Sequence, residues 1–247
     1  MHPILFTIGP LTLRSYGLMM ALGFLCGMLL AAWLYRRRGG DPEAIFDITA
    51  WVMVGSIVGA RLMYVAVQPA EFEAQPWAIV AVWQGGLVYY GGLIGACAAA
   101  WLWDRRRHGG WAVIDALTPG LALGQALGRV GCFLNGCCYG RVSASCGLVF
   151  PGVSSQPVLP TQLYESAGCL LLALGLAWLH GIRRFKGQVF ALYLILYACL
   201  RFGLEFLRGD AERGTLLGLP WLSPGQWTSL LALAAGLLLF RRLRRAA

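Results

Sequence analysis

The sequence predicts an all-α polytopic membrane protein with about seven transmembrane helices, and three observations support this fold class. Of its 247 residues, 58% are hydrophobic and only 13% are charged, whereas soluble domains carry about 25% charged residues. The apolar residues gather into seven runs, most of them near the roughly 20 residues that a helix needs to cross a hydrocarbon core. Short basic bursts separate many of these runs. No second, soluble domain is indicated, so residues 1–247 are expected to form a single membrane-embedded domain.

The seven runs can be taken in chain order as seven spans. The first ends at Arg36 and lacks a following small-residue cleavage site, so we interpret it as a retained span and not as a signal peptide. The third and seventh are short and are expected to extend into their glycine-rich or proline-bearing flanks. The predicted spans are Tyr16–Tyr35, Ala44–Val67, Leu87–Trp103, Ala112–Leu134, Leu163–His180, Gln188–Leu207 and Gln226–Phe240.

The basic bursts predict the orientation of the chain. They are Arg36–Arg38, Arg105–Arg107, Arg183–Lys186 and Arg241–Arg245, and they hold 13 of the 20 Lys and Arg residues. With seven spans, all four bursts fall on one side. The positive-inside rule makes that side the cytoplasm, with the N-terminus on the periplasmic side and the C-terminus inside. The net charge of +9 is therefore not a basic face for nucleic acid, and no nucleic-acid partner is expected.

On the opposite side, residues 135–161 form the longest predicted connection. A connection of this length usually has a function or is disordered. Ionisable residues in or beside the flanking spans favour a function. We expect residues 135–161 to be a periplasmic-side loop region next to a functional site.

Ionisable residues within spans are the strongest sign of a site, because each is unfavourable in hydrocarbon. Arg201 and Glu205 are one helical turn apart and can pair, and Arg208 lies two turns from Arg201 on the same face. Structural ion pairs between helices are one interpretation. The other is an anion site, since arginines outnumber acids and match phosphate geometry. The residues in question are Arg14, Arg61, Arg129, Glu165, Arg201, Glu205, Arg208 and Asp210.

Six motifs follow one another over nearly the whole chain. The most distinctive is Gly128–Arg141, which reads GRVGCFLNGCCYGR. The others are Arg14–Met19, Gly55–Arg61, Gly85–Gly95, Pro160–Glu165 and Tyr197–Arg208. As an ordered set, more than singly, these motifs resemble those of the bacterial prolipoprotein diacylglyceryl transferase family, whose signature reads roughly G-R-x-G-N-F-x-N-x-E-x-x-G at Gly128–Arg141.

The resemblance implies an enzyme of lipoprotein maturation in the bacterial inner membrane, with its active site facing the periplasmic side. Such an enzyme transfers the diacylglyceryl group of phosphatidylglycerol to the lipobox cysteine thiol of a prolipoprotein and forms a thioether. The implied partners are phosphatidylglycerol, the signal-peptide segment that carries the lipobox, and membrane lipids. No metal ion and no organic cofactor are expected.

The resemblance, taken with the chemistry of the reaction, assigns roles to individual residues. Arg129 and Arg201 would hold the phosphate, Glu165 and Glu205 would orient these arginines, and Tyr90 occupies the position of a proposed thiol-activating histidine. The candidate catalytic residues are thus Arg129, Arg201, Tyr90 and Glu165. The candidate substrate-binding residues are Tyr16, Arg61, Asn135, Gly140, Tyr197, Glu205 and Arg208. Each tyrosine could instead be an interface residue, and the glycines could serve close helix packing.

The sequence departs from the family pattern in the residues that handle the acceptor thiol. Tyr90-Gly91-Gly92 replaces His-Gly-Gly, and His2, His108 and His180 all lie in unsuitable positions. A tyrosine with a pKa near 10 is a poor base at neutral pH. Three alternatives stay open: the field of the arginines creates the thiolate, neighbouring arginines depress the pKa of Tyr90, or the chemistry differs. Leu159 also stands where many relatives have histidine.

Cysteines replace two polar residues of the signature, Asn by Cys132 and Glu by Cys137. Together with Cys138 and Cys146 they form a cluster with the spacing C-x4-C-C-x7-C. A disulfide is favoured in an oxidising compartment. A reactive thiol, zinc and inert packing are the alternatives, although adjacent cysteines with irregular spacing do not match the usual zinc sites. Four further cysteines lie singly within predicted spans and are expected to be packing residues: Cys26, Cys97, Cys169 and Cys199.

Two functional alternatives accompany the transferase prediction. One is a related membrane transferase with a different acceptor or lipid donor. The other is a non-catalytic protein that binds lipids or lipoproteins and keeps the arginine site. Labelled diacylglyceryl transfer to a lipobox peptide distinguishes all three.

Overall fold

The structure, a computed structural model, describes residues 3–8, 11–73, 75–107, 110–151, 154–209 and 222–246. These residues are mostly helical and divide into two compact units. Unit 1 comprises Met1–Gly40 and Ile114–Ala247, and unit 2 comprises Asp41–Val113. Unit 2 is therefore an insertion between two segments of unit 1.

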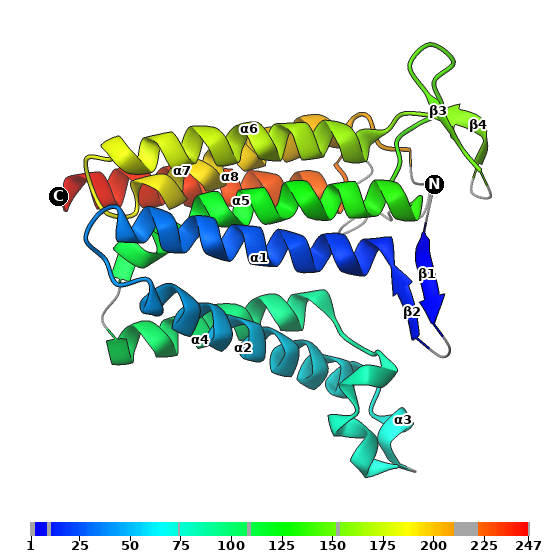
Figure 1. The fold of residues 1–247 in the computed structure, drawn as a ribbon, viewed down its shortest axis with the longest axis horizontal. Coiled ribbons are helices and arrows are strands. Elements are labelled where there is room, and N and C mark those ends of the chain that lie inside the picture. The colour runs from blue at the N-terminus through cyan, green and yellow to red at the C-terminus, as the bar shows by residue number, and fades with distance from the viewer. Residues whose placement is uncertain are drawn as a thin grey trace. The chain divides into compact units, whose positions relative to one another are not determined.

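Unit 1 is a helical bundle with two small antiparallel β-hairpins (Figure 1). Helix α5 begins in unit 2 and passes into unit 1. The hairpin strands are β1 (Ile4–Ile8), β2 (Leu11–Arg14), β3 (Leu148–Phe150) and β4 (Ser154–Val158). The helices are α1 (Ser15–Arg36), α5 (Gly110–Asn135), α6 (Thr161–Ile182), α7 (Gln188–Glu205) and α8 (Pro224–Arg245).

Unit 2 is built on two long helices, α2 (Glu43–Val67) and α4 (Tyr89–Arg107). The chain between them forms the short helix α3 (Ala70–Glu73) and two 3₁₀ turns, η1 (Pro76–Val80) and η2 (Val82–Gln84). This connection turns the chain back toward the start of α2, so α2 and α4 pack antiparallel.

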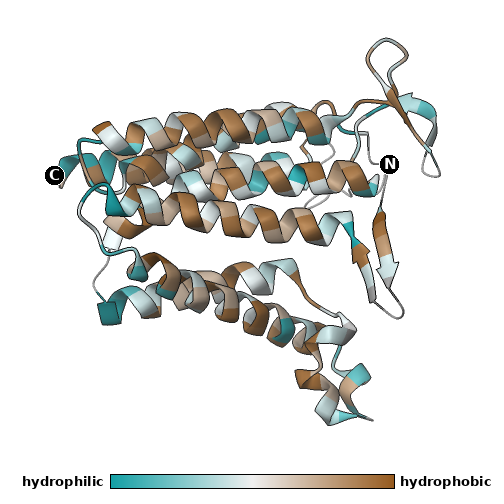
Figure 2. Cartoon of the chain, viewed as in Figure 1, coloured by the Kyte–Doolittle hydropathy of each residue, from teal (hydrophilic) through white to brown (hydrophobic). Residues whose placement is uncertain are grey.

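Each of the seven predicted spans coincides with a long helix: α1, α2, α4, α5, α6, α7 and α8. Among the described residues, four of them (α1, α2, α6 and α7) are long and apolar enough to cross a membrane by length and composition. Figure 2 shows their apolar character as long brown stretches. The protein is thus a helical membrane protein, while the count of seven spans and the orientation of the termini stay predictions.

The structure adds two features to the predicted spans. Helices α4 and α8 run on through arginine bursts, because arginine is a good helix former and a cation is favourable at a helix C-terminus.

The two hairpins were not predicted. Strand β2 shows the alternation Leu11-Thr12-Leu13-Arg14 that strands favour, but the segment is too short to stand out beside spans of 20 residues.

Glycines bring the helices of each unit into backbone contact. In unit 1, a Cβ atom on Gly27 of α1 would lie 2.5 Å from the carbonyl oxygen of Gly120 on α5. In unit 2, a Cβ on Gly59 of α2 would collide with the carbonyl oxygen of Gly91 on α4. Small residues spaced by four allow such close approach in membrane helices. The expectation that glycines serve helix packing is confirmed at these positions.

The core of unit 1 lies between α5, α6 and α7. It is formed by Ala122, Ala173, Leu176, Val189 and Tyr193, all nearly inaccessible to solvent. These residues fix the three helices that carry the charged residues described below.

At one end of unit 1, polar contacts and ring packing tie the helix termini together. Asp115 of α5 accepts hydrogen bonds from the backbone N–H groups of Gly187 and Phe190, at the start of α7. Arg38 donates to the carbonyl oxygen of His180, and the ring of Phe185 packs against that of Phe240. The end of α1, the α6–α7 connection and the end of α8 therefore meet here (Figure 1), and three of the four basic bursts lie at this end.

The glycine contact between α1 and α5 makes a prediction about stability. Gly27→Ala is expected to lower the free energy of unfolding by about 1–3 kcal/mol, because its Cβ has no room beside Gly120. Gly17→Ala on the same helix meets nothing within 4 Å. This control should be neutral or stabilising by up to about 1 kcal/mol through helix propensity. Thermal unfolding in detergent checks both, and equal midpoints would contradict the prediction.

Candidate active site

The candidate site lies at the end of unit 1 opposite the three basic bursts, where α5 ends and α6 begins (Figure 1). A short connection after α5 is bound to two other segments of the chain. Gly140 donates its N–H to the carbonyl oxygen of Leu159 at 2.7 Å, and Arg141 donates to that of Leu207 at 2.9 Å. A Cβ on Gly140 would lie 2.5 Å from the same Leu207 oxygen, so only glycine allows this approach. The connection thus joins the segment before α6 to the end of α7.

The first turn of α6 holds the segment that contains the cysteines. Gln162 donates from Nε2 to the carbonyl oxygen of Cys137 at 2.6 Å, and Thr161 donates from its hydroxyl to that of Cys138 at 3.1 Å. Cys138 has a φ of 63°, the left-handed region, and no other described non-glycine residue has a positive φ. Such a conformation persists only where the surroundings enforce it, and here two buried side chains do so.

A buried network joins α5, α6 and α7 through Glu165. Arg129 Nη2 lies 3.0 Å from Glu165 Oε1, and the Tyr197 hydroxyl donates to the same oxygen at 3.1 Å. Tyr197 stacks on Tyr193, whose hydroxyl donates to Gln125 Oε1 at 2.8 Å. The Glu165 carboxylate therefore holds one side of the Arg129 guanidinium, and Tyr197 of α7 fixes that carboxylate in turn.

A second pair ties α7 to the start of α8. Arg201 Nη2 lies 2.9 Å from Glu205 Oε2, as the spacing of one turn predicts. The hydroxyl of Ser223, the N-cap of α8, donates to Glu205 Oε1 at 2.7 Å. Arg201 Nη1 is buried and has no hydrogen-bond partner among the described residues. Arg201 thus keeps a donor for a further acceptor.

Three thiols converge near Arg129 and Arg208. The Sγ atoms of Cys132, Cys137 and Cys138 all lie within 4.8 Å of one another. The pKa of the Cys138 thiol is lowered to about 5, because Cys132 and Cys137 hydrogen-bond to its sulfur and the positive charges of Arg208 and Arg129 lie nearby, against the opposing effect of burial. A soft metal ion or a reactive thiolate suits such a group.

The other predicted site residues of unit 1 surround this group. Tyr16 lies at the start of α1, and a Cβ on Gly131 would lie 3.4 Å from its ring. Asn135 ends α5 and hydrogen-bonds the Cys137 thiol. Arg208 forms a β-bridge with Gly140. Cys146 is exposed and lies outside the group of three thiols. All eight cysteines are free thiols in the structure.

Arg61 of unit 2 is buried and bound to the backbone. Its guanidinium donates to the carbonyl oxygens of Ala78, Ile79, Gly85 and Gly86 at 2.6 to 3.0 Å. These bonds fix the connection between α3 and α4. These hydrogen bonds give Arg61 a structural role, which its position in the sequence did not reveal.

Tyr90 is the second residue of α4 in unit 2; the residue is 58% exposed, and its ring packs edge-on against that of Tyr89. His180 is buried in the last turn of α6, at the end of unit 1 that carries the basic bursts. His2, His108 and Asp210 lie outside the described residues. None of the described histidines lies near the three thiols.

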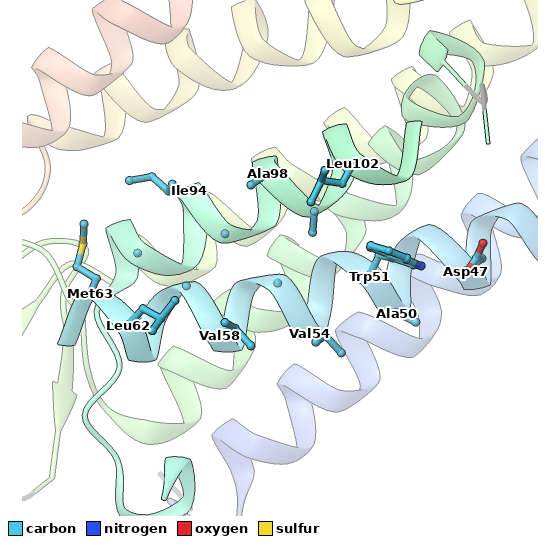
Figure 3. Close-up of a pocket in the computed structure, with 15 residues that line it drawn as sticks. Asp47, Ala50, Trp51, Val54, Val58, Leu62, Met63, Ile94, Ala98 and Leu102 are labelled. Carbon is cyan, nitrogen blue, oxygen red and sulfur yellow. The ribbon is translucent and has the colours of Figure 1, made fainter. Parts of the chain in front are cut away.

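Unit 2 also contains an apolar groove of about 910 Å³ between α2 and α4 (Figure 3). Val54, Val58 and Leu62 line one side, and Ile94 and Leu102 line the other. Its one charged residue, Asp47, accepts a hydrogen bond from Trp103 and pairs with Arg107. The groove therefore offers no cation that could hold a phosphate.

The sequence prediction did not assign roles to several residues that build the site. Thr161 and Gln162 hold the cysteine segment, and Ser223 holds Glu205. Thr161 and Gln162 could have been found, since they stand in the Pro160–Glu165 motif and a glutamine at the edge of an apolar run needs partners. Ser223 and Gln226 form the pattern of a capping box, which also identifies the start of α8.

Comparison with known proteins decides the family. The family model of prolipoprotein diacylglyceryl transferases matches residues 3–242. This chain belongs to that family. The match confirms the prediction drawn from the ordered motifs.

Relatives from different bacteria agree with this assignment, and all three below are named phosphatidylglycerol–prolipoprotein diacylglyceryl transferases. The one from Synechococcus elongatus is 39% identical and covers 96% of this chain and 85% of its own length. The one from Nitratidesulfovibrio vulgaris is 36% identical and covers 99% and 95%. The one from Aromatoleum aromaticum is 39% identical and covers 95% and 92%. The similarity thus extends through both units.

The Arg129–Glu165 pair makes a second prediction about stability. Glu165→Ala is expected to lower the free energy of unfolding by about 3–5 kcal/mol, because it leaves a mostly buried guanidinium without its counter-charge. Tyr197→Phe removes one hydrogen bond to Glu165 and keeps the ion pair, so about 1–2 kcal/mol is expected. Thermal unfolding in detergent measures both. A Glu165→Ala loss no larger than that of Tyr197→Phe would show that the pair does not hold the helices.

Proposed function

We propose that this chain transfers the diacylglyceryl group of phosphatidylglycerol to the lipobox cysteine of prolipoproteins, the step that makes them lipoproteins. Membership of the prolipoprotein diacylglyceryl transferase family supports a transferase of lipoprotein maturation. The names of its relatives support phosphatidylglycerol and a prolipoprotein as the two substrates. The arginine pairs at the end of α5 and in α7 are the observation that connects this activity to a place in the structure.

The reaction creates negative charge on the phosphate. The thiolate sulfur attacks the glyceryl carbon that bears the phosphate ester, a carbon–sulfur bond forms, and the carbon–oxygen bond breaks. The electron pair of that bond leaves with glycerol phosphate, so a singly charged phosphodiester becomes a doubly charged phosphomonoester. Donors that strengthen their interaction with this growing charge lower the barrier.

Arg129 and Arg201 are placed to stabilise this charge. Glu165 and Glu205 hold one side of each guanidinium, so little reorganisation is needed when the phosphate binds. Both arginines lie within electrostatic range of Tyr197, which is one turn before Arg201 on α7. We assign Arg129 and Arg201 to the phosphate and the two glutamates to positioning.

We assign the remaining candidate residues to the lipid headgroup and to the segment that carries the thiols. Tyr16 can donate a hydrogen bond to the glycerol headgroup, and the Tyr197 hydroxyl, which donates to Glu165, can accept one from it. Arg208 adds positive charge beside the thiols. Asn135 and Gly140 shape the segment that carries them. Arg61 contributes by holding the chain that precedes Tyr90.

We also propose seven spans within a single membrane-embedded domain, with the N-terminus and the arginine site on the periplasmic side of the inner membrane. The arginine site and three of the basic bursts lie at opposite ends of unit 1 (Figure 1), which supports this orientation under the positive-inside rule. Residues 135–161, with the hairpin β3–β4, would then face the periplasm.

Substitution of the two arginines tests the assignment of the phosphate site. Arg129→Ala and Arg201→Ala are each expected to reduce transfer of labelled diacylglyceryl to a lipobox peptide by about 100-fold or more. Arg244→Ala, in the exposed last turn of α8, is the matched control and should leave the rate unchanged. The thermal unfolding midpoints of the same variants, measured in parallel, distinguish a loss of activity from a loss of the fold. A folded Arg129→Ala, Arg201→Ala double variant with full activity would place the anion site elsewhere.

Substitution of Tyr90 tests whether its phenol replaces the histidine of the family motif. A tyrosine phenol is a poor general base, so we expect Tyr90→Phe to change the transfer rate by less than about tenfold. Transfer to the lipobox peptide measures the rate. A loss of about 100-fold or more would make the phenol a base or an essential hydrogen-bond donor.

A further inference from the structure

The three thiols of Cys132, Cys137 and Cys138 have the geometry of a metal site. Their sulfur atoms lie within 4.8 Å of one another. Three thiolates around one zinc ion, with bonds of about 2.3 Å, stand about 4 Å apart. Small side-chain rotations therefore bring all three within bonding distance of a common centre. The irregular spacing in the sequence concealed this, because Cys132 lies in the last turn of α5 and the other two cysteines lie in the connection after that helix.

The backbone around the thiols is fixed by the rest of unit 1. Cys137 donates its N–H to the carbonyl oxygen of Cys132 at 3.1 Å, and Gln162 and Thr161 hold the carbonyl oxygens of Cys137 and Cys138. Gln162 and Thr161 are almost completely buried. A site whose ligands are held in place before the ion arrives binds it more tightly.

The surroundings suit an anionic metal–thiolate group. Three thiolates and one Zn²⁺ carry one net negative charge, and the positive charges of Arg129 and Arg208 lie close by. Asn135 hydrogen-bonds Cys137 and can orient that ligand from outside. Thiolate ligands select zinc over magnesium or calcium. Three protein ligands also leave one coordination position open, as catalytic zinc sites do.

The open position matches the chemical need of the reaction. The acceptor is a thiol, the reaction needs its thiolate, and none of the described histidines lies near the three thiols. A thiol bound to zinc is deprotonated. We propose that Cys132, Cys137 and Cys138 bind a zinc ion that takes the acceptor cysteine of the prolipoprotein as its fourth ligand. This inference rests on the proposed transferase function.

The reaction then balances without a protein base. The acceptor thiol loses its proton to water as its sulfur binds zinc. That sulfur attacks the glyceryl carbon, the carbon–oxygen bond breaks, and glycerol phosphate departs with the electron pair toward Arg129 and Arg201. The product thioether is uncharged, a weak zinc ligand, and it leaves the open position free for the next acceptor.

Metal content tests the site itself. Full-length protein purified in detergent without chelators and without added reductant is expected to hold about one zinc ion per chain. Cys132→Ser and Cys137→Ser should each lower this content at least about tenfold. Cys146→Ser is the matched control, since Cys146 is exposed in the same connection and outside the group of three thiols, and it should keep its zinc. Zinc-free starting protein, equal zinc in all variants, or a disulfide between two of the three cysteines would each overturn the proposal.

Cobalt tests the open position without any need for catalysis. Co²⁺ bound in place of zinc should give a thiolate-to-cobalt charge-transfer band. A lipobox peptide should raise its intensity by about one third as a fourth thiolate binds. The same peptide with serine in place of cysteine should not. No difference between the two peptides would exclude the acceptor as a ligand.

Transfer measured with metal-free and zinc-loaded protein separates the two proposals. We expect metal removal to reduce transfer at least about 100-fold and zinc to restore it. Equal transfer in both states would overturn the zinc proposal and leave the transferase function intact. Zinc binding and peptide ligation without any transfer would overturn the transferase function and leave the metal site intact.

Discussion

The neutralisation of buried arginine by buried glutamate is the constraint on which the rest of unit 1 depends. A lone guanidinium among apolar helices is strongly unfavourable, so Arg129 and Arg201 each require a partner at a defined place, and for both this partner is a carboxylate. Glu165 supplies it to Arg129 across α5 and α6, and Tyr197 of α7 completes the contact. Glu205 supplies it to Arg201 and is in turn held by Ser223 of α8. The same contacts that place the charges therefore join four helices.

The connection after α5 depends on this arrangement. Its backbone is bound to the segment before α6 and to the end of α7, which the two ion pairs keep in position. Gly140 allows the close approach, and the left-handed turn at Cys138 lets three thiols converge. Arg129, which we propose to bind the phosphate, and the three sulfurs, which we propose to bind a metal ion, thus lie close together at one end of the bundle. Activation of the sulfur and departure of the phosphate, the two requirements of the proposed thiol alkylation, would then be met at the same end of the bundle.

Much of this could be predicted from the sequence, because it follows from local patterns. Apolar length determines the helices, and a spacing of four residues determines that Arg201 and Glu205 meet. The convergence of Cys132 with Cys137 and Cys138 could not be predicted, because it depends on a left-handed residue and on hydrogen bonds from Gln162, far along the chain.

The role of Arg61 was also hidden. A charge in a span suggests a ligand, yet its hydrogen bonds go to backbone carbonyls whose position only the folded connection defines. The hairpins escaped prediction for a related reason, since strands of three to five residues carry too little pattern to stand out beside long apolar runs.

The glycine contact between α1 and α5 has a consequence for the order in which the chain can assemble. Helix α1 is synthesised first, but the helix that accepts its glycine face follows only after all of Asp41–Val113 has been made. The α2–α4 pair, by contrast, is local and can close as soon as α4 is inserted. During biosynthesis the glycine face of α1 therefore gains this partner only once α5 has been made, and α6, α7 and α8 join the bundle afterwards.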